Sequence, residues 1–107
     1  VYSKHIHSPM VAPIFPAIVF EWDDANREKN YKKHNVTVEE CEAVFFNKPL
    51  TIFDDLLHSK SEERWYAMGR TKSGRPLAVV FTMRKDRIRI ISARDMDKYE
   101  RNLYEKT

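Results

Sequence analysis

Arginine alternates with isoleucine along the segment RKDRIRIISAR, residues 84–94, which holds five basic residues and one acidic residue. Successive side chains of a β-strand point to opposite faces, so Ile88 and Ile90 should enter a core while Arg87 and Arg89 line the other face. A basic sheet face can bind phosphate groups, or it can be the solvated side of an antiparallel sheet. The pattern alone leaves both interpretations open.

A second segment, residues 63–71, also sorts its side chains by alternation. Arg64, Tyr66 and Arg70 fall on one face of the predicted strand. Two arginines with a tyrosine between them could hold a phosphate and stack a base. Strict alternation puts Glu63 opposite Arg64, so the two residues share a site only if the strand begins after Glu63 or a bulge turns it.

The helix predicted up to His34 has an unusual composition. From residue 27 onward its basic residues outnumber a single acid, Glu28, and the only convincing apolar positions of the helix are Ala25 and Tyr31. A helix this polar buries little surface, so core packing does not account for its composition. It is either a solvated element or one that presents cations such as Lys33 to a nucleic acid.

Other kinds of catalytic site find little support. Two glycines are too few for a phosphate-cradling loop, and no serine or cysteine lies in a nucleophile motif. The single cysteine, Cys41, fits an apolar helical pattern, so we expect a buried hydrophobic residue and a reducing compartment. The segment DDLLH, residues 54–58, could hold a metal or an acid–base pair, although a hydrophilic loop with turn-forming aspartates explains it better.

Length and composition predict one globular domain. The chain has 107 residues, 42% hydrophobic and 33% charged, which is enough for a single core. Residues 1–16 hold three of the five prolines and should form an extended arm, which leaves residues 17–107 as the folded domain. No segment is long and apolar enough to cross a membrane, so we expect a cytoplasmic protein. The net charge of +3 favours an acidic partner.

The elements that would position these residues follow from periodicity and capping signals. Asp23 or Asp24 can begin the first helix, with Asn35 as a left-handed stop after His34, and Thr37 begins a second helix with capping-box spacing. Together the signals predict an α+β fold, a small antiparallel sheet with two helices in the N-terminal half and one at the C-terminus. The predicted elements are a buried strand at 17–22, helices ending near 34 and 46, a short strand at 50–53, strands at 63–71, 77–84 and 87–94, and a helix after Asp97. The strand at 77–84 is expected in the centre of the sheet. The last helix should bury an apolar stripe of Met96, Tyr99 and Leu103.

Several short motifs follow one another in a characteristic order between residues 20 and 106. They are Phe20-Glu21-Trp22-Asp23, Asn30, Lys33-His34, the helix after Thr37, His58-Ser59, Glu62-Glu63-Arg64, Arg89-Ile90-Ile91-Ser92-Ala93-Arg94, Glu100-Arg101 and Tyr104-Glu105. Their order and spacing resemble the BrnT family of ribonuclease toxins. Asn35 stands where that family usually has glycine, which is compatible with a left-handed helix cap.

The resemblance implies a RelE-like fold and a role as the toxin of a type II toxin–antitoxin system, which inhibits translation and growth by cleaving RNA. The expected partners are a BrnA-like antitoxin, with a higher toxin–antitoxin assembly, and an RNA substrate. No membrane partner, cofactor or metal is expected.

Metal-independent RNA cleavage by the ribose 2′-hydroxyl needs a base, an acid and fixed cations around the phosphorane. Histidine and glutamate are the candidates for proton transfer, with the base and the acid not assigned between them. The expected catalytic residues are His34, Glu63, Arg64 and Arg89. The expected substrate-binding residues are Lys33, Arg70, Arg94 and Tyr104. The alternative is a non-catalytic RNA- or partner-binding module, which would bind RNA in a salt-sensitive way and form no product.

Overall fold

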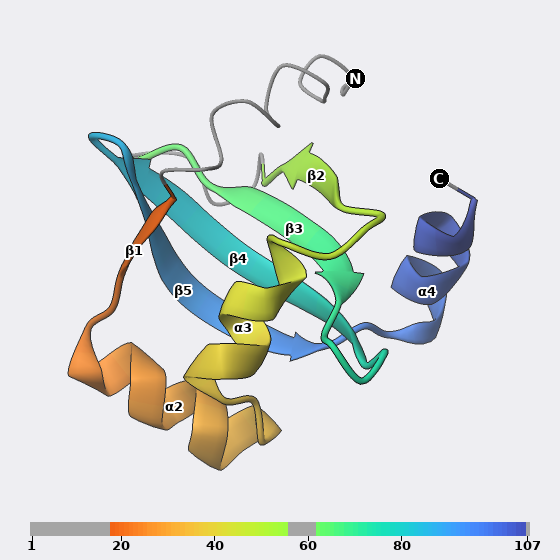
Figure 1. Cartoon of the computed structure of the whole chain (residues 1–107), viewed down its shortest axis with the longest axis horizontal. Coiled ribbons are helices and arrows are strands. Elements are labelled where there is room, and N and C mark those ends of the chain that lie inside the picture. Colours follow the sequence, from red (N-terminus) through yellow and green to blue (C-terminus); the bar gives the residue numbers. More distant parts are fainter. Residues whose placement is uncertain (1–17, 56–61, 107) are drawn as a thin grey trace.

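The computed structural model describes residues 18–55 and 62–106, which form a five-stranded sheet and three helices (Figure 1). In chain order the elements are β1 (Val19–Glu21), α2 (Asp24–His34), α3 (Val38–Val44), β2 (Thr51–Asp54), β3 (Trp65–Arg70), β4 (Pro76–Arg84), β5 (Arg87–Asp95) and α4 (Lys98–Glu105). The predicted α+β class and the positions of its helices are confirmed. The predicted arm at residues 1–16, most of the predicted loop at residues 54–58 and the His58-Ser59 motif lie outside the described residues.

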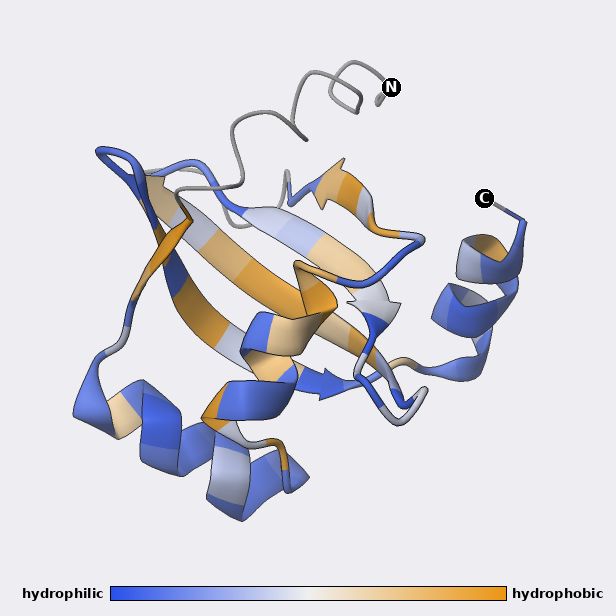
Figure 2. Cartoon of the chain, viewed as in Figure 1, coloured by the Kyte–Doolittle hydropathy of each residue, from blue (hydrophilic) through white to orange (hydrophobic). Residues whose placement is uncertain are grey.

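The sheet has the strand order β1-β5-β4-β3-β2, in which β2 to β5 are antiparallel and β1 runs parallel to β5. The apolar strand β4 lies in the centre, as predicted, and is among the most hydrophobic elements in Figure 2. The prediction of a buried first strand is wrong. β1 is an edge strand of three residues, and its Val19 is 46% exposed.

One face of the sheet is covered by α3, which lies in front of the strands in Figure 1. Cys41, Val44 and Phe45 enter the main core there, and the Phe45 ring meets the edge of Phe81 of β4 at 5.2 Å. The helix can approach the sheet closely because β3 has glycine at position 69. A Cβ atom on Gly69 would lie 3.0 Å from the Val44 side chain.

Helix α2 lies along the edge of β5 beyond the short strand β1. Its attachment is polar: the Asn26 amide donates to the Ile90 carbonyl at 3.4 Å, and the Asn30 side-chain oxygen accepts from the Ala93 N–H at 3.2 Å. Asn30 is the buried residue of the helix, whereas the predicted apolar position Tyr31 is 57% exposed. Two amides therefore satisfy backbone groups of β5 that no strand pairs, which explains how so hydrophilic a helix is held (Figure 2).

The helix boundaries follow the predicted caps closely. Asp23 accepts from the Asn26 N–H at the start of α2, and Asn35 ends the helix with φ 55° and ψ 42°. The capping boxes that begin at Thr37 and at Asp97 are both formed. In the described part of the chain, no helix combines the length and apolar character that a membrane crossing requires.

Helix α4 packs at one end of the opposite face of the sheet. A second, small core forms there from Met68, Ala78, Met96 and Tyr104. The predicted apolar stripe of α4 is only partly correct, because Tyr99 is 74% exposed while Met96 is buried. Leu103 is 37% exposed, so Tyr104 is the helix residue that anchors α4 to the sheet.

Candidate functional site

Three polar side chains form a row on the sheet face opposite α3. Thr82 of β4 pairs with Arg89 of β5, and Arg64 directly precedes Trp65, the partner of Phe81, so Arg64 is level with Thr82. Adjacent strands lie about 4.8 Å apart, so the Cα atoms of the two arginines are roughly 10 Å apart. The two arginines thus flank Thr82, which is itself only 1% exposed. We call this side of the sheet the arginine face.

A β-bulge brings Arg94 to the arginine face. Residues 89 and 94 are five positions apart, so strict alternation would place them on opposite faces. The pairing of β4 with β5 slips by one residue after Phe81, which leaves Ile91 as an extra residue in β5. Arg94 consequently pairs with Ala78, whose side chain belongs to the second core on the same face as Arg89.

Arg89 lies between two carboxylates from the segment that precedes α2. Its Nη1 atom is 3.6 Å from Glu21 Oε2, and its Nη2 atom is 3.2 Å from Asp23 Oδ2. The other oxygen of Asp23 accepts from the Asn26 N–H at 3.0 Å and caps α2. The Arg89 side chain is 21% exposed, so a bound phosphate would contact a guanidinium that carboxylates hold in place and would have to compete with Glu21 and Asp23 for it.

The Arg94 guanidinium is bound by a carboxylate of α4. Its guanidinium donates two hydrogen bonds to the Glu100 carboxylate at 2.7 and 2.9 Å, and these bonds raise the pKa of Arg94. Burial raises the pKa of the neighbouring Tyr66, the charge of Asp55 adds to the rise, and the Arg94 guanidinium opposes it. Tyr66, Arg94 and Glu100 thus form a polar cluster on the α4 side of the arginine face, and a phosphate at Arg94 would have to compete with Glu100.

Glu63 lies just before β3, at the Arg64 end of the row. Its backbone carbonyl accepts a hydrogen bond from the Thr82 hydroxyl at 2.7 Å, and its side chain is exposed. The strand therefore begins after Glu63, which is one of the two arrangements that would let Glu63 and Arg64 share a site.

Lys33 and His34 lie at the other end of the sheet. The His34 carbonyl accepts from Arg75 Nη2 at 3.1 Å, and the same guanidinium binds Asp95 at the end of β5. Between the level of Asp95 and that of Arg89 the strands span roughly 15 to 20 Å at about 3.3 Å per residue. The expected pairing of His34 with Glu63 around one phosphate is therefore not assembled in this arrangement.

Arg75 connects the turn before β4 to three elements, α2, α3 and β5, and the sequence did not predict this role. It donates to the backbone carbonyls of His34 and Asn35, to both oxygens of Glu40 at 3.1 and 3.2 Å, and to both oxygens of Asp95 at 2.7 and 3.1 Å. These hydrogen bonds raise the pKa of Arg75 and lower that of Asp95. Burial tends to raise the pKa of Glu40, but its bonds to Thr37 and Arg75 lower it overall. The sequence places Arg75 in a turn and gives no signal of these contacts.

Arg70 and Tyr104, two predicted substrate-binding residues, contact each other. The Arg70 guanidinium lies 5.6 Å from the centre of the Tyr104 ring. That ring is only 2% exposed, and its hydroxyl donates to the Pro49 carbonyl at 2.5 Å. Tyr104 is thus placed to anchor α4 and to orient Arg70 at the edge of the arginine face, because its ring has little surface left for a ligand.

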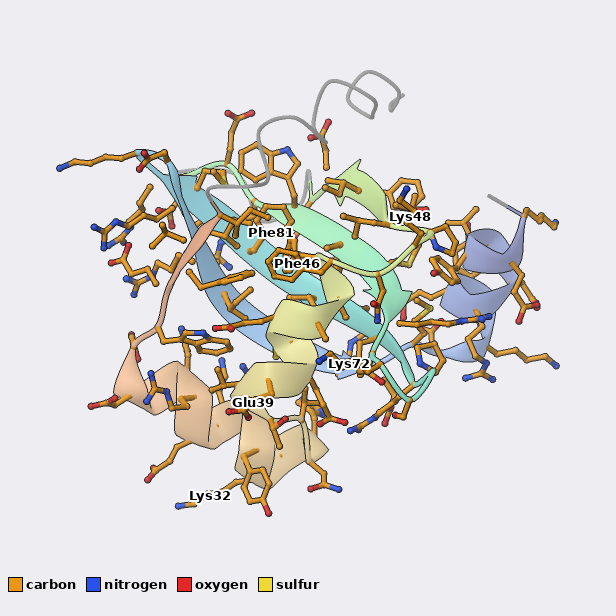
Figure 3. The ribbon with its side chains drawn as sticks, in the orientation of Figure 1. Lys32, Glu39, Phe46, Lys48, Lys72 and Phe81 are labelled. Carbon is orange, nitrogen blue, oxygen red and sulfur yellow. The ribbon has the colours of Figure 1, made fainter. Side chains whose placement is uncertain are left out.

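A hollow of about 450 Å³ lies on the other side of the molecule, between α3 and the turn from β3 to β4. Glu39, Glu42, Phe46 and Lys72 are among its lining residues, and Figure 3 shows Glu39 and Phe46 along α3 with Lys72 on the adjacent turn. Carboxylates dominate its charged groups, and such a lining repels phosphate. The arginine face is therefore the better candidate for binding a polyanion.

Neither a metal centre nor a reactive thiol emerges from the described residues. In residues 18–55 and 62–106, no three His, Cys, Asp or Glu side chains gather in a way that could hold a metal ion. Cys41 is fully buried, as predicted, and burial raises the pKa of its thiol to about 12, with Glu40 and Glu42 acting in the same direction.

This arrangement of sheet and helices is shared with a known class of small α+β ribonuclease toxins. The chain superimposes on the crystal structure of the Brucella abortus ribonuclease toxin BrnT with a TM-score of 0.58 and 22% sequence identity, over 76% of this chain and 97% of that one. At that identity the likeness establishes the fold. A search of curated proteins found no match.

A family model described as the ribonuclease toxin BrnT of type II toxin–antitoxin systems matches residues 22–100. The chain belongs to the BrnT family of ribonuclease toxins, and the family resemblance drawn from the motifs is confirmed. Membership of a type II system implies an antitoxin protein as its partner.

Proposed function

We propose that the chain is an endoribonuclease that cleaves RNA on its arginine face without a metal ion. Family membership supports the ribonuclease activity. The observation that supports this location is the row of Arg64, Thr82 and Arg89, in which the Cα atoms of the two arginines are roughly 10 Å apart on one face of the sheet. Rigid strands position catalytic cations more accurately than loops do.

In the proposed reaction the ribose 2′-hydroxyl attacks the adjacent phosphorus, and the P–O5′ bond breaks. Negative charge grows on the phosphorane oxygens in the transition state, and fixed cations stabilise that charge best when they need not reorganise. Arg64 and Arg89 are the proposed stabilising groups, since the planar guanidinium can grip two phosphate oxygens. Glu63 remains a candidate for proton transfer because its backbone adjoins Thr82. His34 and Lys33 are better placed to contact another nucleotide of the same strand.

The decisive test is RNA cleavage in excess chelator. We expect the wild type to cleave single-stranded RNA under these conditions, and Arg64→Ala or Arg89→Ala to lose about 100- to 1,000-fold in rate, the usual effect of removing one group that stabilises developing charge. Lys32→Ala is the matched control, because it also removes one positive charge but lies on α2, away from the sheet (Figure 3). We expect it to cleave normally.

Three outcomes would contradict parts of this proposal. Loss of wild-type cleavage in chelator would remove the metal-free mechanism. Normal cleavage by folded Arg64→Ala and Arg89→Ala variants would remove the site. Salt-sensitive RNA binding without any product, on naked RNA and in a translation reaction, would favour the alternative of a non-catalytic binding module.

The proposed antitoxin is BrnA-like and covers the arginine face. Covering this face would neutralise its cations and exclude RNA at once, which is the simplest way for one partner to switch off the activity. The presence of an antitoxin partner follows from the family, whereas its BrnA-like identity and its docking face are part of the proposal.

A further inference from the structure

The arginine row continues into β1 and ends in a carboxylate. In the parallel pairing of β1 with β5, Glu21 is the partner of Arg89, so both side chains leave the sheet on the same face. The neighbouring pair of Phe20 and Ile88 points the other way, into the main core. One cross-strand row over four strands therefore reads Arg64, Thr82, Arg89, Glu21.

We propose that Glu21 is the catalytic base of the ribonuclease reaction. This inference rests on the proposed function, and it assigns the proton-transfer step to a residue that the sequence did not single out for it. Glu21 accepts the proton of the 2′-hydroxyl as the 2′-oxygen forms its bond to phosphorus. The P–O5′ bond then breaks, and the leaving 5′-oxygen takes a proton from a solvent water. The hydroxide that this leaves removes the proton from Glu21 and restores the carboxylate, and the products are a 2′,3′-cyclic phosphate and a 5′-hydroxyl.

The geometry at Arg89 supports this assignment. Glu21 Oε2 lies 3.6 Å from Arg89 Nη1, and the Glu21 side chain is 33% exposed. A phosphate gripped by Arg89 would therefore lie beside the carboxylate, within the length of one ribose. In the described part of the chain, Glu21 makes no other hydrogen bond or ion pair, so its second oxygen can accept a proton without breaking the fold.

Three other carboxylates near the arginine face are engaged or buried, and the exposed Glu63 lies at the far end of the row, next to Arg64. Asp23 caps α2 with one oxygen and contacts Arg89 with the other. Glu100 binds Arg94 through both oxygens and also accepts the Asp97 N–H of its capping box. Asp55 is only 5% exposed. Glu21 combines exposure, contact with an arginine of the row and an oxygen that is not engaged elsewhere.

The test compares Glu21→Gln with Asp23→Asn in the full chain. Both substitutions replace a carboxylate at Arg89 with a neutral amide of equal size, and asparagine still caps a helix well. We expect Glu21→Gln to lower the cleavage rate by about 100-fold or more, the usual contribution of a general base, and to bind RNA at least as tightly as the wild type. We expect Asp23→Asn to stay within about tenfold of the wild-type rate.

The pH profile separates proton transfer from positioning. As a base, Glu21 should produce a fall in wild-type rate toward acid pH that is absent from the profile of Glu21→Gln, and Glu21→Asp should restore part of the rate. Equal losses in Glu21→Gln and Asp23→Asn with unchanged profiles would show that both residues only orient Arg89, and would overturn the inference. So would near-normal cleavage by a folded Glu21→Gln variant.

The same measurements distinguish this inference from the proposed function. If Arg89→Ala abolishes cleavage while Glu21→Gln does not, the site stands and the base is another residue, with Glu63 the next to test. If the wild type does not cleave RNA at all, both proposals fail together. Thermal melting of each variant shows whether it is folded.

Discussion

At the scale of single residues, one arginine ties the ends of two helices to the sheet. Arg75 links the end of α2 through two carbonyls, the start of α3 through Glu40 and the end of β5 through Asp95. Its side chain is 23% exposed, so these charge-assisted bonds are only partly screened by water. The position of Lys33 and His34 therefore depends on a residue more than 40 positions away in the sequence.

We predict that Arg75→Met lowers the free energy of unfolding by about 2 to 3 kcal/mol at pH 7, because it removes several hydrogen bonds to charged groups. The pKa values of Asp95 and Glu40 are lowered in the folded state, so their contribution is present at neutral pH and lost as pH falls below about 4. The difference from the wild type should therefore shrink at pH 3. Urea denaturation at pH 7 and pH 3 measures the free energy of unfolding of the wild type and of Arg75→Met, and Arg87→Met, at an exposed position, is the control. A loss of the same size at both pH values would contradict this explanation.

At the scale of elements, hydrogen bonds to backbone groups of β5 determine where α2 lies. The helix has little apolar surface to bury, and its place along β5 follows from Asn26 and Asn30, which bond backbone groups beyond the end of β1. Its last turn is then closed by Asn35 in the left-handed conformation.

We predict that Asn35→Ala lowers the free energy of unfolding by about 1 to 2 kcal/mol, because an alanine Cβ is strained at φ 55°. Asn35→Gly should change it by less than about 0.5 kcal/mol, since glycine adopts this conformation readily. Urea denaturation of the two variants makes the comparison. Equal losses would show that the asparagine side chain, rather than the backbone angle, is what matters at this position.

At the scale of the whole molecule, charge is divided between two sides. Arg64, Arg89 and Arg94 share the arginine face, whereas Glu39, Glu40 and Glu42 lie on α3 on the opposite side of the sheet. On the arginine face the carboxylates of Glu21, Asp23 and Glu100 pair with Arg89 and Arg94 and offset much of the positive charge. A polyanion would still meet guanidinium groups on that side, whereas it would meet mainly carboxylates at α3.

We predict that the affinity for RNA falls as the salt concentration rises. Each arginine–phosphate contact with a single strand contributes about −0.7 to the slope of log affinity against log salt concentration, so three contacts predict a slope of about −2. Arg64→Ala should reduce the slope by about 0.7, while Lys32→Ala should leave it unchanged. Binding by the preformed toxin–antitoxin complex should be lost. Fluorescence anisotropy with labelled RNA measures the affinity of the wild type, of the two variants and of the complex. A complex that binds RNA as tightly as the free toxin would contradict the proposal that the antitoxin covers the arginine face.

The local structure of this protein could be predicted from its amino-acid sequence. Cap residues such as Asp23, Thr37 and Asp97 act on the turn that follows them, and alternation within β3 and the first half of β5 fixed which side chains share a face, because these effects depend on near neighbours. The family and its fold class could also be inferred from the order of motifs.

Contacts between groups that are distant in the sequence could not be predicted and follow from the three-dimensional fold. The bulge at Ile91 reverses the alternation of β5 and brings Arg94 to the face of Arg89, and the parallel pairing of β1 places Glu21 beside that arginine. Register between strands depends on the packing of the whole sheet, which local patterns do not encode. The same long-range geometry separates His34 from Glu63, because α2 ends near Asp95 while β3 begins at the opposite end of the sheet.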